Sequence, residues 1–518
     1  MRIHGRVLAA FVGLAFGFSS IAHAEWRKAE SPHFVVYSDA SEADLRSAIE
    51  ELEEFDAVLR ALSGVEEDND SPKLLGYMVS KSQVRGFSPG ISEGVLGFYS
   101  SSPEVTAFIA SNEEVEEEFS PTGSRIPIKI KYLAAKSILQ HEYTHHFMLQ
   151  HFPSKYPKWY VEGFAEYYST TSITDSGIEI GSFQLGRVGS LRDGRWTPMR
   201  QIMGSLSGKY DSGFVADLYA QGWLAVSYFN STPERRKALS QILAATRAGE
   251  KNLDKIMLDS TGMTFEEFDI ELRKYMNGKV LTRTYEGWKY QAPPIQISSL
   301  PAAQSKALVL DTRLKLARGM SQAQKDRTLA EVRKLRVANP RVDVMDLLAA
   351  RAEVYFGDAA AGRSLAQAVA AAQPQNAEAH YLIGLSLMEE GRKDENARAQ
   401  KFKEARPALG RAFKYDPNHV GALYQTGLSL MANGDMNENT ANIFMLAHQL
   451  APQVGEISID AAQAMLSLGK KQEAIALLQP VANDPHGGKL SERAQALLDG
   501  VVGGVPTENP ALAALAPG

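Results

Sequence analysis

The stretch HEYTHHFMLQHFPSKYPKWYVEGFAEYYS, residues 141–169, decides which fold and chemistry the chain is expected to have. His141 and His145 are four residues apart, so on a helix their rings project from one face. The residues before them, KYLAAKSILQ (131–140), contain no Gly or Pro and place apolar side chains at helical spacing. The sequence therefore predicts an HExxH pattern on a helix running from about Lys131 to Phe152.

An HExxH helix suits zinc, because two neutral imidazoles bind the ion while the intervening Glu acts as a general base. His141 and His145 are the predicted ligands, and Glu142 is predicted to take a proton from the zinc-bound water. The alternative is a helix whose histidines share no role. His146 and His151 fit no ligand position and are expected to pack or to lie on the surface, with contact to substrate as the alternative.

The run PKWYVEGFAEYYS (157–169) resembles the second motif of gluzincin metallopeptidases. It is most similar to the peptidase MA-like branch, with kinship to the NEGFA segment of zinc aminopeptidases. The resemblance implies that Glu162 is the third zinc ligand. The spacing from His145 to Glu162 is shorter than in the aminopeptidases, and the short loop FPSKYPK (152–158) accounts for the difference.

Glu166 lies one helical turn after Glu162, where it is predicted to accept a hydrogen bond from the second nitrogen of a zinc-bound histidine. The alternative prediction for both carboxylates is a solvated position on the helix surface, but the aromatic residues around them favour burial. Gly163 is expected to let this helix pack closely on the HExxH helix.

LYAQGWLAVSYF (218–229) resembles the YEKG segment of the same aminopeptidases, whose Tyr stabilises the oxyanion of the transition state. The resemblance gives this catalytic role to Tyr219, and Gly222 leaves room for close backbone packing. The alternative is an aromatic core residue, since the chain has 19 tyrosines.

Two upstream segments bear on the substrate. EVTAFIA (104–110) is predicted to be a strand, and the resemblance assigns it the role of the edge strand that binds the substrate backbone. Residues 113–118 carry five glutamates. They are expected to form a solvated loop, with an acidic rim that favours basic substrates as the alternative.

Residues 1–24 are predicted to be a signal peptide. Arg2 and Arg6 precede an apolar run too short to span a bilayer, and Ala22-His23-Ala24 forms a small-x-small site before Glu25. An uncleaved membrane anchor is the alternative. The chain has no cysteine, which excludes disulfides and thiolate ligands. The mature protein is expected to be periplasmic or secreted, with no membrane span after signal cleavage.

Residues 25–285 mix strand-like and helical stretches, which predicts an α+β domain. The resemblance to gluzincins implies that this domain is a zincin-like metallopeptidase. Ser41 is a predicted N-cap, and Thr264 with Glu267 forms a predicted capping box. Residues 286–301 include APPIQISSLP and are expected to be a linker. The net charge of -6 does not indicate nucleic acid as a partner.

From residue 302 the chain is helical and repetitive. Residues 379–391 and 422–434 share GLSLM, and five prolines recur at intervals of 34, 43, 35 and 33 residues. This period resembles tetratricopeptide repeats, which implies an all-α solenoid of about five units over 302–490. A non-repeating bundle is the alternative. Residues 491–518 are expected to be a disordered tail.

The leading hypothesis is an exported zinc-dependent peptidase whose repeats recruit a protein substrate, or a protein partner on their concave face. A second hypothesis is a repeat-based scaffold with a degenerate or regulatory peptidase fold. A third is a zinc hydrolase that acts on a non-peptide amide or ester.

Overall fold

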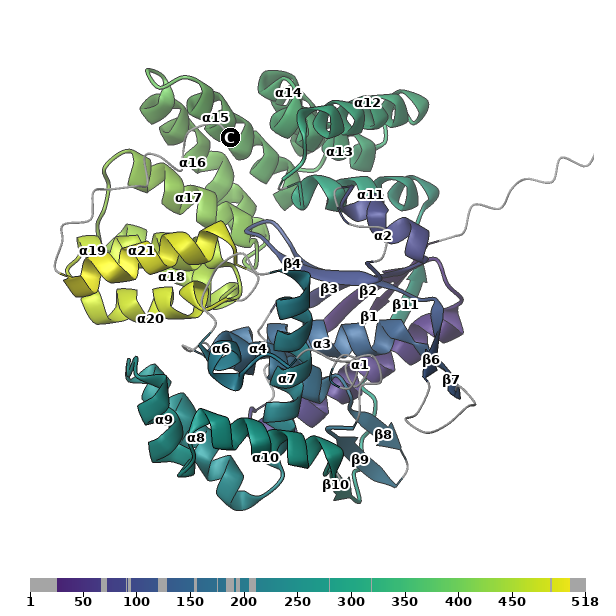
Figure 1. The fold of residues 1–518 in the computed structure, drawn as a ribbon. Helices are drawn as coiled ribbons and strands as arrows, with labels where there is room; N and C mark the ends of the chain where they lie inside the picture. Colours follow the sequence, from purple (N-terminus) through teal and green to yellow (C-terminus); the bar gives the residue numbers. More distant parts are fainter. Residues whose placement is uncertain are drawn as a thin grey trace, which may run out of the picture.

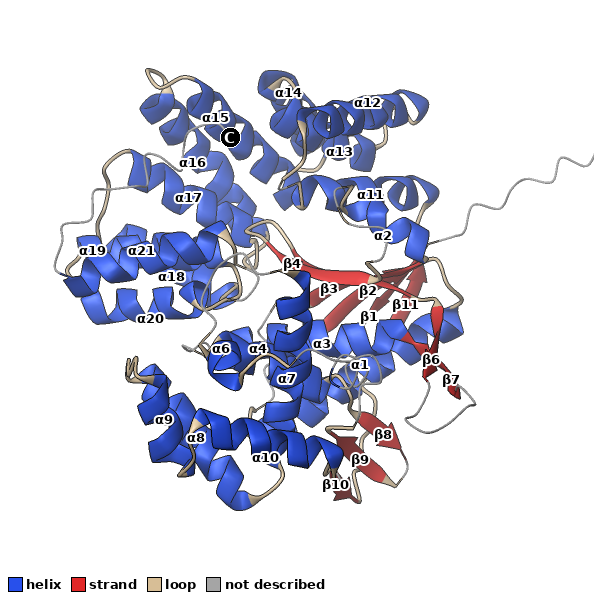
Figure 2. Cartoon of the chain, in the orientation of Figure 1, coloured by secondary structure: helices blue, strands red, loops and turns tan. Residues whose placement is uncertain are grey.

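The computed structural model describes residues 26–66, 72–89, 91, 95–119, 128–152, 156–174, 176–182, 191, 196–204, 211–278, 280–317, 319–484 and 487–503. The predicted signal peptide lies outside them. A mixed α+β region comes first, and a curved array of helices follows it (Figures 1 and 2). This agrees with the predicted fold class at the level of an α+β part and a helical repeat part.

A six-stranded mixed sheet is the framework of the first region, in the order β11-β1-β2-β3-β5-β4. Its strands are β1 (Arg27–Glu30), β2 (Phe34–Ser38), β3 (Leu74–Val79), β4 (Gly97–Ser101), β5 (Thr106–Ser111) and β11 (Gln296–Ser299). β2, β3 and β5 are parallel, and the other pairs are antiparallel. The expectation that EVTAFIA is the edge strand is wrong, because β5 lies between β3 and β4. β4 is at the edge.

Two small sheets flank this framework. β6 (Glu114–Phe119) pairs with β7 (Ile128–Leu133), and β8 (Ser172–Thr174), β9 (Gly177–Ile180) and β10 (Arg283–Glu286) form the other sheet. The glutamate-rich segment is therefore mostly a strand rather than the expected loop. The predicted helix over 131–152 begins only at Ala134, because β7 continues to Leu133.

Helices cover both faces of the large sheet. On one face α1 (Glu42–Ser63) and α3 (Ala134–His151) bury residues such as Phe34, Leu45 and Phe147. On the other face α2 (Lys81–Phe87) and α11 (Ala302–Lys315) pack over Tyr77 and Ile109. The predicted N-cap of α1 is confirmed, since Ser41 accepts a hydrogen bond from the backbone N–H of Asp44.

A second core holds the helices that follow α3. They are α4 (Lys158–Tyr168), α6 (Met199–Met203), α7 (Ser212–Asn230), α8 (Pro233–Arg247), α9 (Leu253–Thr261) and α10 (Phe265–Asn277). Trp223 and Phe229 of α7 lie at its centre, fully buried. α10 begins with the predicted capping box of Thr264 and Glu267.

α4 and α7 cross at two glycines. A Cβ on Gly163 would lie 2.4 Å from the backbone oxygen of Gly222, and a Cβ on Gly222 would lie 2.9 Å from the backbone oxygen of Trp159. Gly163 therefore packs against α7 and not against the HExxH helix, which corrects the sequence-based expectation. The predicted close packing at Gly222 is confirmed.

Gly163→Ala is expected to destabilise the protein by about 1–3 kcal/mol, because backbone atoms on both helices must move to admit the methyl group. Urea unfolding measures this loss. Gly410→Ala, in an exposed part of a helix where a Cβ meets no atom within 4 Å, serves as the control. It is expected to leave stability unchanged or to raise it by up to about 1 kcal/mol. Equal stability of the two variants would contradict the crossing geometry.

The second region is a solenoid of paired helices. After α11 come α12 (Gln322–Ala338), α13 (Asp343–Phe356), α14 (Ala359–Ala372), α15 (Ala377–Lys393), α16 (Arg398–Tyr415), α17 (Val420–Ala432), α18 (Glu438–Leu450), α19 (Gly455–Ser467), α20 (Lys471–Ala482) and α21 (Lys489–Gly503). α13 packs on α14, α15 on α16, α17 on α18 and α19 on α20, and α21 closes the array against α20.

Two segments differ from their sequence-based descriptions. α21 occupies the first part of the expected disordered tail and buries Ala494 and Leu497 against α19 and α20. The remainder, 504–518, lies outside the described residues. The expected linker 286–301 contains β11, whose hydrogen bonds to β1 make it part of the large sheet. The chain therefore returns to the first sheet before the solenoid begins.

The helices of the solenoid curve around the turn between β4 and β5, residues 102–105, and contact it with their inner face (Figure 1). The buried guanidinium of Arg351, on α13, donates to Glu104 at 2.7 Å and to Asp311 at 2.9 Å. Tyr77 of β3 shares a 2.5 Å hydrogen bond with Thr312 of α11. Part of the face that the sequence assigned to a protein partner therefore contacts the chain itself.

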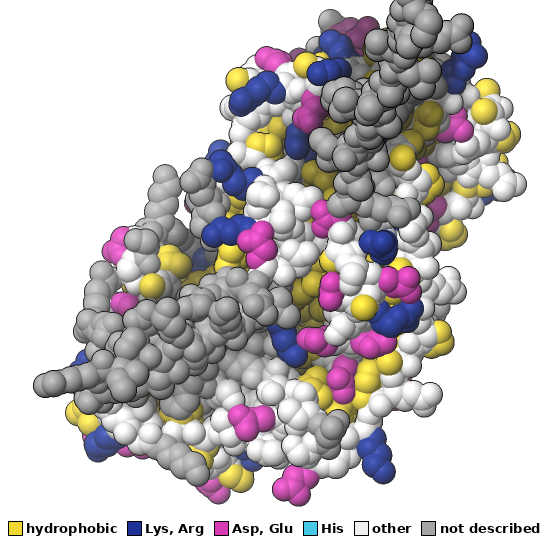
Figure 3. All heavy atoms as spheres, turned by 90° about the vertical axis from the view of Figure 1, so that its right-hand side faces the viewer, with side chains coloured by type: hydrophobic (Ala, Val, Ile, Leu, Met, Phe, Trp, Pro, Cys, Tyr) yellow, Lys and Arg dark blue, Asp and Glu magenta, His cyan; other side chains and the backbone are white. Residues whose placement is uncertain are grey.

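Among the described residues, no helix combines the length and hydropathy that a membrane crossing requires. Figure 3 shows one face of the molecule, on which acidic and basic side chains are interspersed with apolar ones. Positively and negatively charged side chains are therefore mixed on this face.

Candidate metal centre

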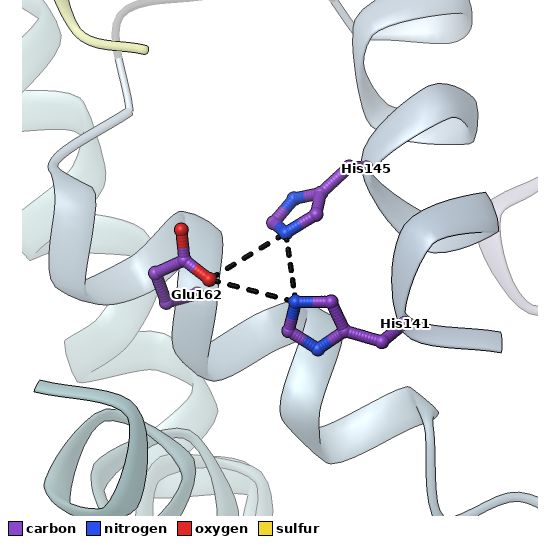
Figure 4. Close-up of side chains that lie close together, drawn as sticks. All are labelled: His141, His145 and Glu162. Carbon is purple, nitrogen blue, oxygen red and sulfur yellow. Dashed lines mark hydrogen bonds and ion pairs between the residues drawn. The ribbon is translucent and has the colours of Figure 1, made fainter. Parts of the chain in front are cut away.

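α3 and α4 bring three predicted ligands together (Figure 4). The Nε2 atoms of His141 and His145 are 3.0 Å apart. Oε2 of Glu162 lies 3.6 Å from Nε2 of His141 and 3.5 Å from Nε2 of His145. All three side chains are buried. One helical turn aligns the two histidines, and the packing of α4 beside α3 brings in the glutamate.

This donor set fits a zinc ion. Donors about 2.0–2.1 Å from a tetrahedral zinc are about 3.3 Å from one another, close to the three distances between these atoms. Two imidazole nitrogens and one carboxylate oxygen match the ligand types of a catalytic zinc site, which keeps one position open. A fully buried carboxylate such as Glu162 also requires a compensating cation or hydrogen bonds. These residues can therefore hold a metal ion.

Glu166 lies beside His141, on the side of the ring that bears Nδ1. Its Oε1 is 3.4 Å from Nδ1 of His141, the ring nitrogen that faces away from Glu162. Burial by itself lowers the pKa of His141, but the hydrogen bond to Glu162 and the charge of Glu166 outweigh it and raise that pKa above its usual value. The predicted position of Glu166, beside the second nitrogen of a ligand histidine, thus agrees with the geometry.

Tyr219 reaches the same site from α7, whose N-cap Asp211 accepts a hydrogen bond from the backbone N–H of Phe214. The ring of Tyr219 stacks on that of His141, with centroids 5.8 Å apart and planes 15° apart. Burial, followed by the charge of Glu162 and a hydrogen bond to it, raises the pKa of the phenol far above its usual value. The hydroxyl therefore stays protonated and remains a donor at neutral pH.

Glu142 follows His141 on α3 and lies at a cleft beside the site. Together with His145 it lines a cleft of about 600 Å³, which is also bordered by all of β4 except Gly97. The carboxylate is only partly buried, so it can meet a solvent molecule or a substrate in this cleft. The three HExxH residues, the two residues that the resemblance added, Glu162 and Tyr219, and also Glu166 lie on α3, α4 and α7 around one point.

Sequence reasoning missed Tyr99 as a neighbour of the site. Its hydroxyl is 3.0 Å from Nδ1 of His146, which joins β4 to α3. Burial lowers the pKa of His146 to about 3, so the ring is neutral and packs inside the protein as expected. The ring of His151 packs at a tilt of 56° against that of Phe147, with centroids 4.6 Å apart. A Tyr in a short strand carries no sequence signal for such a contact.

A network of polar side chains from α1 and from the residue before β2 contacts α3 at Tyr143. The hydroxyl of Tyr143 donates to Asp56 at 2.5 Å, and Asp56 also accepts a 2.6 Å hydrogen bond from Arg60. His33 Nδ1 lies 2.7 Å from Glu53. His33, Glu53 and Asp56 are close enough to be considered as metal ligands, but Arg60 already compensates the carboxylate of Asp56. Through the hydrogen bond of Tyr143 to Asp56, this cluster holds α3 in place at the residue after Glu142.

Comparisons with known proteins concern the solenoid. A family model of the tetratricopeptide repeat matches residues 347–400 and 396–439, within α13–α18. The helical region thus contains tetratricopeptide repeats, a class of module that binds proteins. No curated protein matches the chain.

Three solved structures are similar over part of the chain. TTC0263, a repeat protein of Thermus thermophilus, is 19% identical, and the match covers 38% of this chain and 99% of that one with a TM-score of 0.33. YrrB, described as a repeat protein with an unusual peptide-binding site, is 18% identical over 37% of this chain and 92% of its own, with a TM-score of 0.26. MamA is 15% identical, and the match covers 38% of this chain and 98% of MamA with a TM-score of 0.26.

Proposed function

We propose that the chain is a zinc-dependent peptidase of the gluzincin type. The observation that carries the proposal is the buried set of His141, His145 and Glu162, with donor atoms 3.0–3.6 Å apart. Glu142 faces a substrate-sized cleft beside this set. The resemblance of both helical motifs to gluzincins supports peptide hydrolysis in particular.

A zinc ion bound by these three residues would supply a Lewis acid and a water of lowered pKa. Glu142 then takes the proton of the attacking water and delivers it to the leaving amine. Tyr219 donates a hydrogen bond to the oxygen that gains negative charge. Glu166 fixes the orientation of the His141 ring through its Nδ1. These roles are proposed from the motifs, and they are supported by the position of Glu142 in the cleft lining and by the contacts of Tyr219 and Glu166 with His141.

The substrate backbone is assigned to β4, because this strand borders the cleft and is last in the sheet among the described strands. An extended peptide beside it gains main-chain hydrogen bonds without a requirement for particular side chains. The proposed location is the periplasm or the extracellular space, on the strength of the signal-like residues 1–24. The repeats are proposed to recruit a protein substrate or partner.

Metal content and hydrolysis together test the proposal. The purified full-length chain is expected to hold one zinc and to cleave β-casein. A chelator is expected to stop cleavage, and added zinc to restore it. Glu162→Ala is expected to lose tight zinc binding, while Glu266→Ala, an exposed residue of α10, retains it. Atomic emission for the metal and electrophoresis of the casein report the two results.

The alternative of a repeat-based scaffold draws on the family match to the repeats. It predicts a stable protein without stoichiometric zinc that cleaves nothing at any metal concentration. Zinc binding without peptide hydrolysis would instead favour the hydrolase that acts on another amide or ester.

A further inference from the structure

The cleft that Glu142 and His145 face has a second wall, and this wall belongs to the solenoid. It comes from the beginning of α19 and the residues just before it, from the end of α20, from described residues between α20 and α21, and from the first residues of α21. The lining residues used below are Gln453, Glu456, Pro480, Val481, Lys489 and Leu490. More than 300 residues of sequence separate this wall from Glu142, and the two meet only through the fold.

Direct hydrogen bonds tie this end of the solenoid to the sheet. Ser101, the last residue of β4, donates to the backbone oxygen of Gln453 at 3.1 Å. The side-chain amide of Gln453 donates to Thr106 of β5 at 3.0 Å. Burial lowers the pKa of Lys158 on α4, and the negative charge of Asp484 opposes that shift. The wall is therefore held beside the edge strand.

Apolar side chains lie on both walls of the cleft. On the solenoid side they are Pro480, Val481 and Leu490, and on the peptidase side they include Met148 and Leu149 of α3. Val481 and Met148 are already largely buried. A cleft of about 600 Å³ is large enough for several residues of an extended chain. An apolar side chain placed between the two walls is shielded from water on both of its sides.

We propose that the last repeat is part of the substrate-binding site and selects extended polypeptides with a large apolar side chain next to the scissile bond. This proposal rests on the proposed peptidase function and deepens it, because it names the substrate class. Successive side chains of an extended peptide point in opposite directions. When the backbone lies along β4, alternate side chains are presented to the wall of Val481 and Leu490.

A peptide library prepared from a bacterial proteome tests the proposal on the full-length, zinc-loaded chain. Mass spectrometry of the products gives the residues around each cut. The wild type is expected to prefer Leu, Met or Phe at one position beside the cut. Leu490→Ala removes much of the wall's apolar contact and is expected to weaken that preference roughly tenfold.

A charge variant keeps the test independent of the folding of Leu490→Ala. Lys489 is exposed and lines the cleft, so Lys489→Glu changes the charge of the wall without disturbing the core. It is expected to raise cleavage beside Lys or Arg about threefold or more. Lys471→Glu, on an exposed position of α20 outside the cleft lining, is the matched control and is expected to leave the cut profile unchanged.

Binding without turnover gives a second readout. A peptide taken from the preferred cut sites is titrated calorimetrically into Glu142→Gln protein, with and without Leu490→Ala. Roughly tenfold weaker binding to the double variant supports the proposal. A cut profile that neither wall variant changes, together with an affinity that Leu490→Ala does not change, would overturn the proposal if the wild type cleaves peptides, and it would leave the peptidase function intact. A zinc-loaded wild type that cleaves no peptide refutes the proposed function, and this proposal with it.

Discussion

Glu142→Gln is expected to reduce peptide hydrolysis by about 10²–10⁴-fold while zinc stays bound. The amide keeps the size and the hydrogen-bonding reach of the side chain but cannot accept the proton of the attacking water. Glu142 is not among the three residues whose donor atoms converge, so its replacement leaves the ligand set intact. Hydrolysis of a peptide from the library and metal analysis of the same sample measure the two effects.

The matched control is Glu266→Gln, the same replacement on an exposed position of α10. It is expected to retain full activity and full zinc content. Loss of zinc in Glu142→Gln would mean that this carboxylate helps to bind the metal, and the assignment of a general base would be wrong. A variant that still hydrolyses at the wild-type rate would remove Glu142 from the reaction altogether.

Tyr219→Phe is expected to lower kcat by about 10²–10³-fold with little change in KM. The hydroxyl is the only group removed, and the ring that stacks on His141 is retained. Burial and the neighbouring Glu162 keep the phenol protonated, so it can donate to an oxygen that becomes negative in the transition state. Steady-state kinetics on one well-cleaved peptide give the split between kcat and KM.

Tyr228→Phe removes a phenol from the same helix at a position that stacks under Arg235, away from the site. It controls for the loss of a hydroxyl from α7 and is expected to keep kcat. A fall of less than about threefold in Tyr219→Phe would reduce this residue to a packing partner of His141. Zinc loss in that variant would instead indicate that the hydroxyl holds Glu162 in place.

Sequence reasoning was most successful where the interactions are local. The ligand pair His141 and His145 depends only on the helical repeat, which puts residues four apart on one face. The cap of α1 at Ser41 and the capping box at Thr264 depend on three consecutive residues beyond each cap. The repeats were recognisable because each unit repeats its own internal packing at a fixed period.

Errors arose where the answer depends on which strands pair and which helices cross, and not on the composition of one segment. EVTAFIA has the composition of a strand, but nothing in its residues says that β4 pairs with it on the outer side. The same applies to β11, which joins the sheet through β1 at the opposite end of the domain. Gly163 carries the signal for a close approach, but the partner, Gly222, is set by how α4 and α7 cross.

By itself the sequence determined the donor types of the candidate site, the helices that bear them and the existence of a helical solenoid. These features follow from hydrogen bonding and side-chain periodicity within a few turns of chain. Only the tertiary structure decided that Glu162 lies 3.5 Å from His145, that β4 is the edge beside the cleft, and that Val481 and Leu490 form its second wall. Contacts between separate elements depend on the packing of whole surfaces, which no local pattern encodes.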